Sequence, residues 1–271
     1  MMDVERYLER IGYRGGREPG AENLAALVKA HRLAVPYETL DLWRGRHVTL
    51  ATETLFDKIV TRRRGGYCYE LNGLFAALLR ELGYNVREYF GRWLFGDRDP
   101  AVPRRNHRVV VVALDGHPNQ IVEVGIAYPF LMAPLGFVFD VSQPVGRQIY
   151  RVVRDPTLSA VVEIRTRDGA WERLLSFDTS PQLPIDFAYA NHWCRTHPES
   201  VFRRVLRAFL PADDGSTKAI VSEPDPETGE LTPTFASTAP DGKQTRTPLR
   251  SEAALAEALR EHFGIVEGLK S

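Results

Sequence analysis

The sequence predicts an α+β fold with an N-terminal helical bundle, a central β-barrel and a C-terminal part that mixes short strands with a helix. Apolar residues repeat at helical spacing through about the first 85 residues, and β-branched runs replace them after Gly83. Pro, Gly, Thr and Asp then dominate 211–248, before a last amphipathic stretch. We therefore expect a helical domain at 1–85, a barrel at 86–184, connecting helices at 185–210 and an α/β unit at 211–271.

The helices of the first part follow from apolar periodicity. In the clearest one, positions i, i+3, i+4, i+7, i+8 and i+11 are all apolar, and Gly83 follows as a stop; these positions are Leu71, Leu74, Phe75, Leu78, Leu79 and Leu82. Thr52 is a candidate N-cap for another helix. The predicted helices are Val4–Ile11, Ala21–Arg32, Thr52–Val60 and Tyr69–Leu82.

The middle of the chain is predicted to be a closed or nearly closed small barrel. Asp115-Gly116 lies between two β-branched runs and is typical of a hairpin turn. The predicted strands are Val86–Leu94, His107–Leu114, Ile121–Ile126, Gln148–Val153, Ala160–Arg167 and Trp171–Phe177.

The last part combines both element types. Ile185–Arg195 is predicted to be a helix that leads into a second one at Ser200–Leu210. Lys218–Val221 and Leu231–Ser237 resemble strands, and Ser251–Phe263 has the i, i+4, i+8 apolar spacing of an amphipathic helix.

Composition excludes several classes of function. Lys plus Arg and Asp plus Glu are both 35, so the balanced charge argues against non-specific binding of nucleic acid. The charged start does not resemble a signal peptide, and no window has the ~18 apolar residues of a membrane span. Cys68 and Cys194 form no CxxC pair, which argues against a disulfide framework and a cysteine-rich metal site. We expect a cytoplasmic protein with no metal and no membrane partner.

Cys68 is the candidate nucleophile. It stands at the start of the predicted helix Tyr69–Leu82, where free N–H groups and a partial positive charge stabilise a thiolate and lower the thiol pKa. Gly65 and Gly66 allow another group to approach the backbone closely. The competing interpretation is a small buried apolar residue, which is how we interpret Cys194.

A cysteine nucleophile needs a base, and the base needs an orienting group. His107 opens one predicted strand, and Glu123 lies in the next, between two valines. If residues 115–120 formed a wide loop, His107 would face Tyr128 on the next strand. Glu123 would then lie about 16 Å away along that strand, at about 3.3 Å per residue. A tight turn at Asp115-Gly116 would place Glu123 on the opposite face, so a triad requires a tight turn together with a bulge, for which Pro118 is a plausible site.

These residues resemble the arylamine N-acetyltransferase family. The match to the nucleophile motif of that family is Arg64-Gly-Gly-Tyr-Cys-Tyr-Glu-Leu-Asn72. Val35-Pro-Tyr-Glu-Thr-Leu40 is similar to its Val-Pro-Phe-Glu-Asn-Leu element, and Val122-Glu-Val-Gly125 to its Val-Asp-Val-Gly strand. The resemblance extends over nearly the whole chain and is weakest in the C-terminal part.

The resemblance implies a cysteine-protease-like catalytic core, with the C-terminal α/β unit as a lid. It implies that acetyl-coenzyme A acylates Cys68, that His107 is the base and Glu123 its orienting group, and that an arylamine, hydrazine or arylhydroxylamine takes the acyl group. Glu123 replaces the aspartate of the family. Ile126 replaces a phenylalanine that lines the acceptor pocket, within Ile126-Ala-Tyr128 in place of Phe-Gly-Gly. Tyr37 is expected either to line the same pocket or to belong to the core.

Other functions fit parts of the pattern. An amide synthase on the same fold would take its acyl chain from a carrier protein, and a hydrolase related to transglutaminases would use water as acceptor. A catalytically altered homologue would only bind, and a zinc enzyme using Cys68 and His107 is the least favoured alternative. Arg64 and Glu38 are expected to form either a buried pair or separate surface charges.

Overall fold

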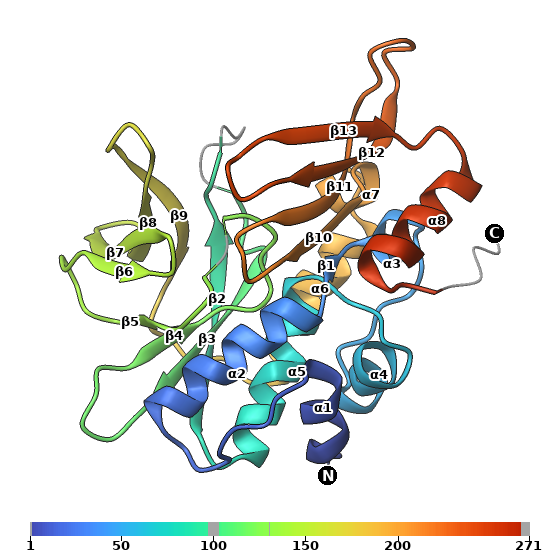
Figure 1. Cartoon of the computed structure of the whole chain (residues 1–271). Helices are drawn as coiled ribbons and strands as arrows, with labels where there is room; N and C mark the ends of the chain where they lie inside the picture. Colours follow the sequence, from blue (N-terminus) through green and yellow to red (C-terminus); the bar gives the residue numbers. More distant parts are fainter. Residues whose placement is uncertain (1, 97–102, 130, 267–271) are drawn as a thin grey trace.

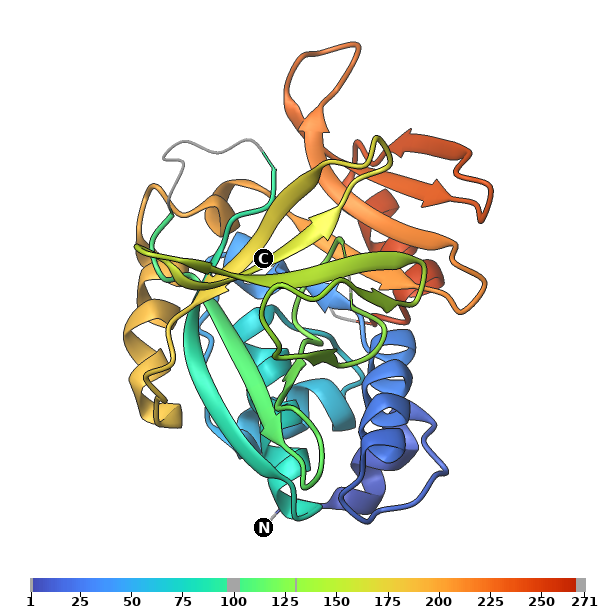
Figure 2. The same ribbon diagram turned by 90° about the vertical axis from the view of Figure 1, so that its left-hand side faces the viewer.

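The computed structural model describes residues 2–96, 103–129 and 131–266. Figure 1 shows the N-terminal helices below, a strongly curved sheet beside them, and a second sheet with the C-terminal helix above. Figure 2, turned by 90°, shows the strands of the curved sheet crossing in front of the N-terminal helices. The predicted α+β fold class is confirmed.

The N-terminal helices have well-defined ends. Asp3 accepts a hydrogen bond from the backbone N–H of Arg6 at the start of the first helix, and Gly12 ends it with a φ of 67°. Thr52 is not an N-cap, because Ala51 occupies that position and makes no side-chain cap bond. The helices are α1 (Val4–Ile11), α2 (Ala21–Ala34), α3 (Leu40–Trp43), α4 (Thr52–Phe56), the π-helical turn η1 (Asp57–Thr61) and α5 (Cys68–Glu81).

The curved sheet is antiparallel and nearly closed into a barrel. Its strands are β2 (Asn85–Trp93), β3 (His107–Ala113), β4 (Gln120–Val122), β5 (Leu135–Gly136), β6 (Gln143–Val145), β7 (Gln148–Asp155), β8 (Ser159–Arg165) and β9 (Trp171–Phe177). They lie in the order β5-β4-β3-β2-β9-β8-β7-β6. The edge strands meet through the Gln143 side chain, which bonds both the N–H and the C=O of Gly136 at 2.9 Å.

The pairing of β3 with β4 is shifted by one residue from the register that a tight turn at Asp115-Gly116 gives alone. Val110 faces Val122 and Val112 faces Gln120, with no shift between them. Continued along β3, this register places His107 opposite position 125, so Glu123 lies on the same face, one diagonal step away. The register is therefore the one expected for a tight turn with one extra residue: the N–H of His117 bonds the carbonyl of Leu114 at 3.2 Å across Asp115-Gly116, and Gly116 has a φ of 73°. β4 ends at Val122 rather than Ile126, because the N–H of Val124 bonds the Asn72 side chain instead of a strand.

The second sheet takes its edge strand from the N-terminal part. Its strands are β1 (Tyr37–Glu38), β10 (Arg207–Pro211), β11 (Thr217–Pro224), β12 (Leu231–Thr238) and β13 (Gln244–Pro248), paired in that order. Helix α8 (Glu252–Phe263) packs its apolar face on this sheet, with Leu255, Leu259 and Phe263 against Leu206 and Ile220.

The connection between the two sheets corrects one prediction. The 3₁₀ turn η2 (Pro184–Asp186) and helix α6 (Phe187–Thr196) occupy the first predicted helix. The second predicted helix, Ser200–Leu210, is wrong: α7 (Val201–Arg204) is one short turn, and β10 follows because its backbone pairs with β1 and β11.

Candidate active site

Cys68 is the first residue of α5 and is 3% exposed. The loop before it packs so closely on β1 that a Cβ on Gly65 would lie 1.9 Å from the carbonyl oxygen of Pro36. Glu70 accepts a hydrogen bond from the N–H of Tyr67 at 3.2 Å, as in a capping box. Loop and helix together fix the position of the sulfur, whose thiol donates to the carbonyl of Asn106 at 3.6 Å.

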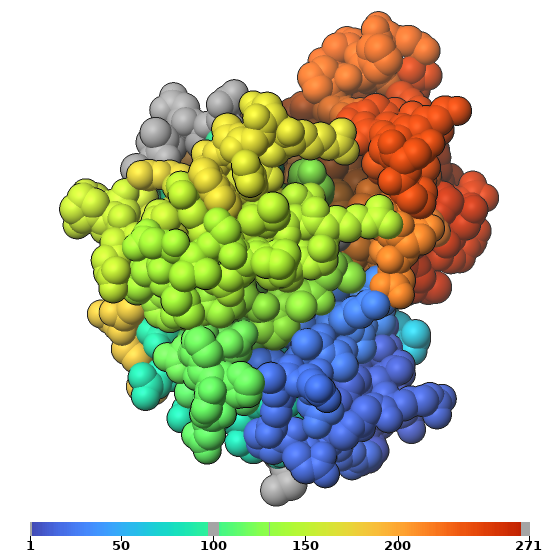
Figure 3. Space-filling view, turned by 60° about the vertical axis from the view of Figure 1, so that its left-hand side comes forward, coloured from blue at the N-terminus to red at the C-terminus, as the bar shows by residue number. Residues whose placement is uncertain are grey.

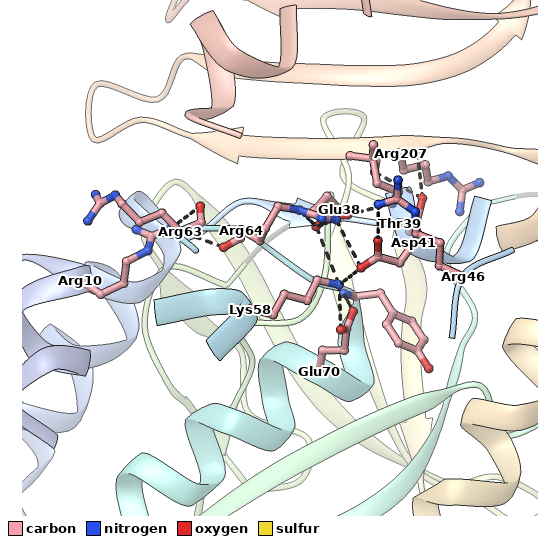
Figure 4. A network of polar contacts seen from close by, with 12 residues as sticks. Arg10, Glu38, Thr39, Asp41, Arg46, Lys58, Arg63, Arg64, Glu70 and Arg207 are labelled. Carbon is pink, nitrogen blue, oxygen red and sulfur yellow. Dashed lines mark hydrogen bonds and ion pairs between the residues drawn. The ribbon is translucent and has the colours of Figure 1, made fainter. Parts of the chain in front are cut away.

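A buried cluster of charged side chains supports this loop (Figure 4). The Arg64 guanidinium donates to Glu38 Oε1 at 2.9 and 2.6 Å, so the expected alternative of a buried pair is the one observed. Lys58 Nζ lies 2.7 Å from Asp41 and 2.8 Å from Glu70. Burial raises the pKa of Asp41, but Lys58 and Arg64 lower it to about 2. Ionised pairs thus lie beneath the nucleophile loop.

His107 and Glu123 form a buried pair beside Cys68. His107 Nε2 lies 2.6 Å from Glu123 Oε2, and the side chains are 3% and 0% exposed. A side-chain hydrogen bond links the imidazole to Cys68. Because Nε2 faces the carboxylate, Nδ1 is the ring nitrogen left for the sulfur. The structure therefore brings together the three residues expected to form a triad.

Asn72 holds the carboxylate in place. Its Nδ2 donates to Glu123 Oε1 at 2.7 Å, and the N–H of Gly125 donates to the same oxygen at 2.7 Å. Asn72 Oδ1 accepts from the N–H of Val124 at 3.0 Å. Asn72 was not predicted to be a functional residue, although a polar residue one turn after Cys68, on the apolar face of the helix, was a signal that could have identified it.

Gly125 allows this loop to reach the nucleophile. A Cβ at this position would lie 2.8 Å from the Cα of Cys68 and 3.0 Å from the Asn72 side chain, so any larger residue would displace one of them. The buried Arg32 side chain holds this loop, because its guanidinium donates hydrogen bonds to the carbonyls of Val124 at 3.2 Å and Ile126 at 2.6 Å.

The pKa values of Cys68 and His107 both differ from their ordinary values. Burial raises the pKa of the Cys68 thiol, and His107 opposes this only in part. The lowered thiol pKa expected from the helix N-terminus is therefore wrong, because burial has the larger effect. Burial also lowers the pKa of His107, but Glu123 and Cys68 outweigh it and raise the pKa to about 10. Glu123 and Cys68 thus favour the charged imidazolium form of His107 beside the sulfur.

Cys68 opens into a cavity of about 280 Å³. Both residues expected at the acceptor pocket line it: Tyr37, which is 8% exposed, and Ile126, which is 3% exposed. Tyr37 also belongs to the apolar core, the other location expected for it. Trp93, Phe95, Tyr128, Phe202 and Phe209 complete a largely aromatic wall.

A larger cleft of about 1040 Å³ separates the barrel from the second sheet. Figure 3 shows it as the hollow between the β8–β9 hairpin in yellow and the C-terminal strands in orange and red. Cations on its walls are Lys29, Arg147, Arg165, Arg167 and Arg246, and carboxylates are Asp213, Glu223 and Asp241. The cleft and the cysteine cavity share Tyr128, Phe209 and Val221, so the two spaces adjoin.

Within residues 2–96, 103–129 and 131–266, no three His, Cys, Asp or Glu side chains are grouped to hold a metal ion. No helix in these same ranges combines the length and the apolar content needed to span a bilayer.

This chain is similar to known N-acetyltransferases over most of its length. The N-acetyltransferase family profile matches residues 21–270. An arylamine N-acetyltransferase of Mycolicibacterium smegmatis is 38% identical over 220 residues, which cover 79% of this chain and 78% of the relative. The solved structure of the Mycobacterium marinum arylamine N-acetyltransferase superposes with a TM-score of 0.86 at 34% identity, over 97% of this chain and 93% of that one.

A second structure of the M. marinum enzyme, in complex with CoA, has a TM-score of 0.85 at 33% identity, again over 97% and 93% of the two chains. With a family profile that covers most of the sequence and a relative more than 30% identical, this chain belongs to the arylamine N-acetyltransferase family and is an acetyltransferase.

Proposed function

We propose that this enzyme moves an acetyl group from acetyl-coenzyme A to an arylamine, hydrazine or arylhydroxylamine, through a thioester on Cys68. The observation that carries the proposal is the buried 2.6 Å pair of His107 and Glu123 in hydrogen-bond contact with the thiol. The coenzyme in the similar M. marinum structure supports the choice of donor.

In the first half-reaction, the proton shared by Cys68 and His107 lies on the ring, and the thiolate sulfur attacks the thioester carbonyl. A His107 pKa of about 10 reflects how strongly Glu123 and the sulfur favour the imidazolium, although burial disfavours the thiolate. The imidazolium then gives the proton to the leaving sulfur of the coenzyme. The first turn of α5 directs its free N–H groups towards the negative charge that develops beside Cys68.

In the second half-reaction, the amine occupies the space that the coenzyme has left. Its nitrogen attacks the acetyl carbonyl on Cys68, and His107 accepts the amine proton and returns it to the cysteine sulfur. The two substrates thus react in turn at one base, which is a ping-pong sequence.

Glu123 orients His107 and stabilises its charged form. The extra methylene, compared with the aspartate that the resemblance implies, is compatible with this role, because one oxygen meets Nε2 while the other is held by Asn72 and Gly125. The imidazole is thereby presented to the sulfur through its other nitrogen.

The donor fits the larger cleft. The phosphates of coenzyme A are anionic, and Arg165 and Arg167 lie on the β8–β9 side of the cleft with Arg147 nearby. From there the thioester end enters the cysteine cavity past the shared residues Tyr128 and Phe209.

The test is intact-protein mass after brief exposure to acetyl-coenzyme A without acceptor. We expect one acetyl adduct on the wild type and none on Cys68→Ala, whereas Cys194→Ala should still be acetylated. An adduct that persists in Cys68→Ala would refute the nucleophile assignment, and no adduct on the wild type would refute the donor.

A further inference from the structure

Asn106 is in contact with the nucleophile. Its backbone carbonyl accepts a hydrogen bond from the Cys68 thiol at 3.6 Å, and it directly precedes His107, the first residue of β3. The half-buried Asn106 also lines the cysteine cavity together with these two residues. Its side chain thus branches from the backbone beside the reacting sulfur, although it takes no part in the triad.

The orientation of this side chain is fixed by one hydrogen bond. Asn106 Oδ1 accepts from the backbone N–H of Trp93, the last residue of β2, at 2.9 Å. Because a backbone N–H can only donate, the amide oxygen is the atom that faces Trp93, and Nδ2 occupies the other branch of the amide. Nδ2 makes no hydrogen bond to any other residue that the structure describes. Its two N–H groups are therefore available to a molecule in the cavity.

The reaction needs hydrogen-bond donors beside this sulfur. When the sulfur attacks a thioester carbonyl, a carbon–sulfur bond forms, the C=O π electrons move onto the oxygen, and that oxygen becomes negatively charged. The first turn of α5 offers free N–H groups, but the N–H of Tyr67 is already bonded to Glu70. Asn106 brings a donor of a second kind to the same cavity, from the segment that leads into β3.

We propose that Asn106 Nδ2 donates a hydrogen bond to the oxyanion in both half-reactions, which makes Asn106 a catalytic residue. This inference rests on the proposed function. When the first oxyanion collapses, the C=O bond re-forms, the bond from carbon to the coenzyme sulfur breaks, and His107 gives its proton to that sulfur. In the second half-reaction, the bond that breaks is the one to Cys68, and the same proton transfer restores the thiol.

The surroundings of Nδ2 favour a large effect on rate. Cys68 and His107 are 3% and 2% exposed, and a hydrogen bond to a developing charge is stronger where water is excluded. Because Trp93 fixes the amide before the substrate binds, the donor needs no reorganisation during the reaction. Removal of one such side-chain donor lowers kcat by roughly 100- to 1000-fold.

The experiment compares two reactions of Cys68 by intact mass, acetylation by saturating acetyl-coenzyme A and alkylation by iodoacetamide, which forms no oxyanion. We expect Asn106→Leu to slow acetylation roughly 100- to 1000-fold and to leave alkylation unchanged. Asn106→Asp keeps an oxygen for the N–H of Trp93 but lacks the donor, so its acetylation should be slowed at least as much. Asn119→Leu is the matched control, because Asn119 is exposed in the loop between β3 and β4 and should react like the wild type.

Three outcomes would overturn the inference. Acetylation and alkylation that slow equally in Asn106→Leu would show that the substitution disturbs the thiol itself. Wild-type acetylation in Asn106→Asp would show that only the bond to Trp93 matters. Slowing of the same size in Asn119→Leu would show that the effect is not specific to the cavity.

A second acetyl donor separates this inference from the proposed function. 4-Nitrophenyl acetate acetylates a thiol through the same kind of oxyanion without a coenzyme, and the release of 4-nitrophenolate is followed by absorbance, with Cys68→Ala as the baseline. We expect release by Asn106→Leu to be roughly 100-fold slower than by the wild type. If the wild type forms no adduct with acetyl-coenzyme A, the proposed function fails, while the ester still tests Asn106. Equal release by both proteins would refute the role of Nδ2.

Discussion

Replacing Glu123 with glutamine tests whether the carboxylate sets the proton affinity of the site. In the wild type, the pKa of His107 rises from 6.5 to about 10 although burial opposes the charge. That difference corresponds to on the order of 5 kcal/mol in favour of the charged ring. Without the carboxylate, burial lowers the pKa of His107 more than the remaining interactions raise it. We therefore expect this pKa to fall below its ordinary value.

The consequence is measurable at Cys68. At pH 7 the variant should have a neutral imidazole and a protonated thiol, because burial raises the pKa of Cys68 and no imidazolium opposes it. Since the thiolate is the reactive form, alkylation by iodoacetamide at pH 7 should slow by on the order of 100-fold. Intact mass measured from pH 5 to 10 gives the rate profile.

Glu123→Asp is the matched control, because it keeps the charge and shortens the side chain by one methylene. We expect it to retain much of the wild-type rate at pH 7. A Glu123→Gln profile that coincides with the wild-type profile would show that the carboxylate does not govern the protonation of His107, and the reasoning would be refuted.

Three further predictions follow from other buried groups. Arg64→Met should lower the free energy of unfolding by about 3–5 kcal/mol in chemical denaturation, because it leaves Glu38 buried without its guanidinium partner. Asn72→Leu should slow acetylation of Cys68 roughly 10- to 100-fold by mass, because Glu123 loses a charge-assisted hydrogen bond. Burial holds the pKa of His31 well below 6.5, so unfolding takes up a proton below that pH. The free energy of unfolding should therefore fall as pH falls from 6.5 towards the folded-state pKa of His31, by up to about 1.4 kcal/mol per pH unit. His31→Gln should reduce this dependence of the free energy of unfolding on pH.

Each of these has a matched control in the chain. Arg62→Met removes an exposed pair with Asp57 and should cost less than about 1 kcal/mol. Asn85→Leu changes an exposed residue at the start of β2 and should leave acetylation unchanged, and His192→Gln changes an exposed histidine and should leave the acid slope unchanged. If any control substitution had as large an effect as the substitution to which it is matched, the corresponding argument would be contradicted.

Local pattern was enough to predict part of this structure. α1 and β9 have the predicted bounds, and α5 begins one residue before its prediction, because apolar period and glycine stops are properties of neighbouring residues. The same signals singled out Cys68, which the fold brings together with His107 and Glu123.

What the sequence did not predict depends on distant partners. β10 was taken for helix, because its pairing with β1 joins residues about 170 positions apart and leaves no local trace. β13 is polar at four of its five positions and has no apolar alternation. The role of Asn72 required knowing that Glu123 faces it.

The two-residue strand β1 has a consequence for synthesis of the chain. Tyr37 pairs with Phe209 in the second sheet and bridges to Gly66 in the nucleophile loop. This dipeptide therefore connects the second sheet to the nucleophile loop. During translation this edge has no β10 partner until residue 211 has left the ribosome. We therefore expect nascent chains stalled before that point to carry an open strand edge beside the cysteine loop and to need protection from aggregation.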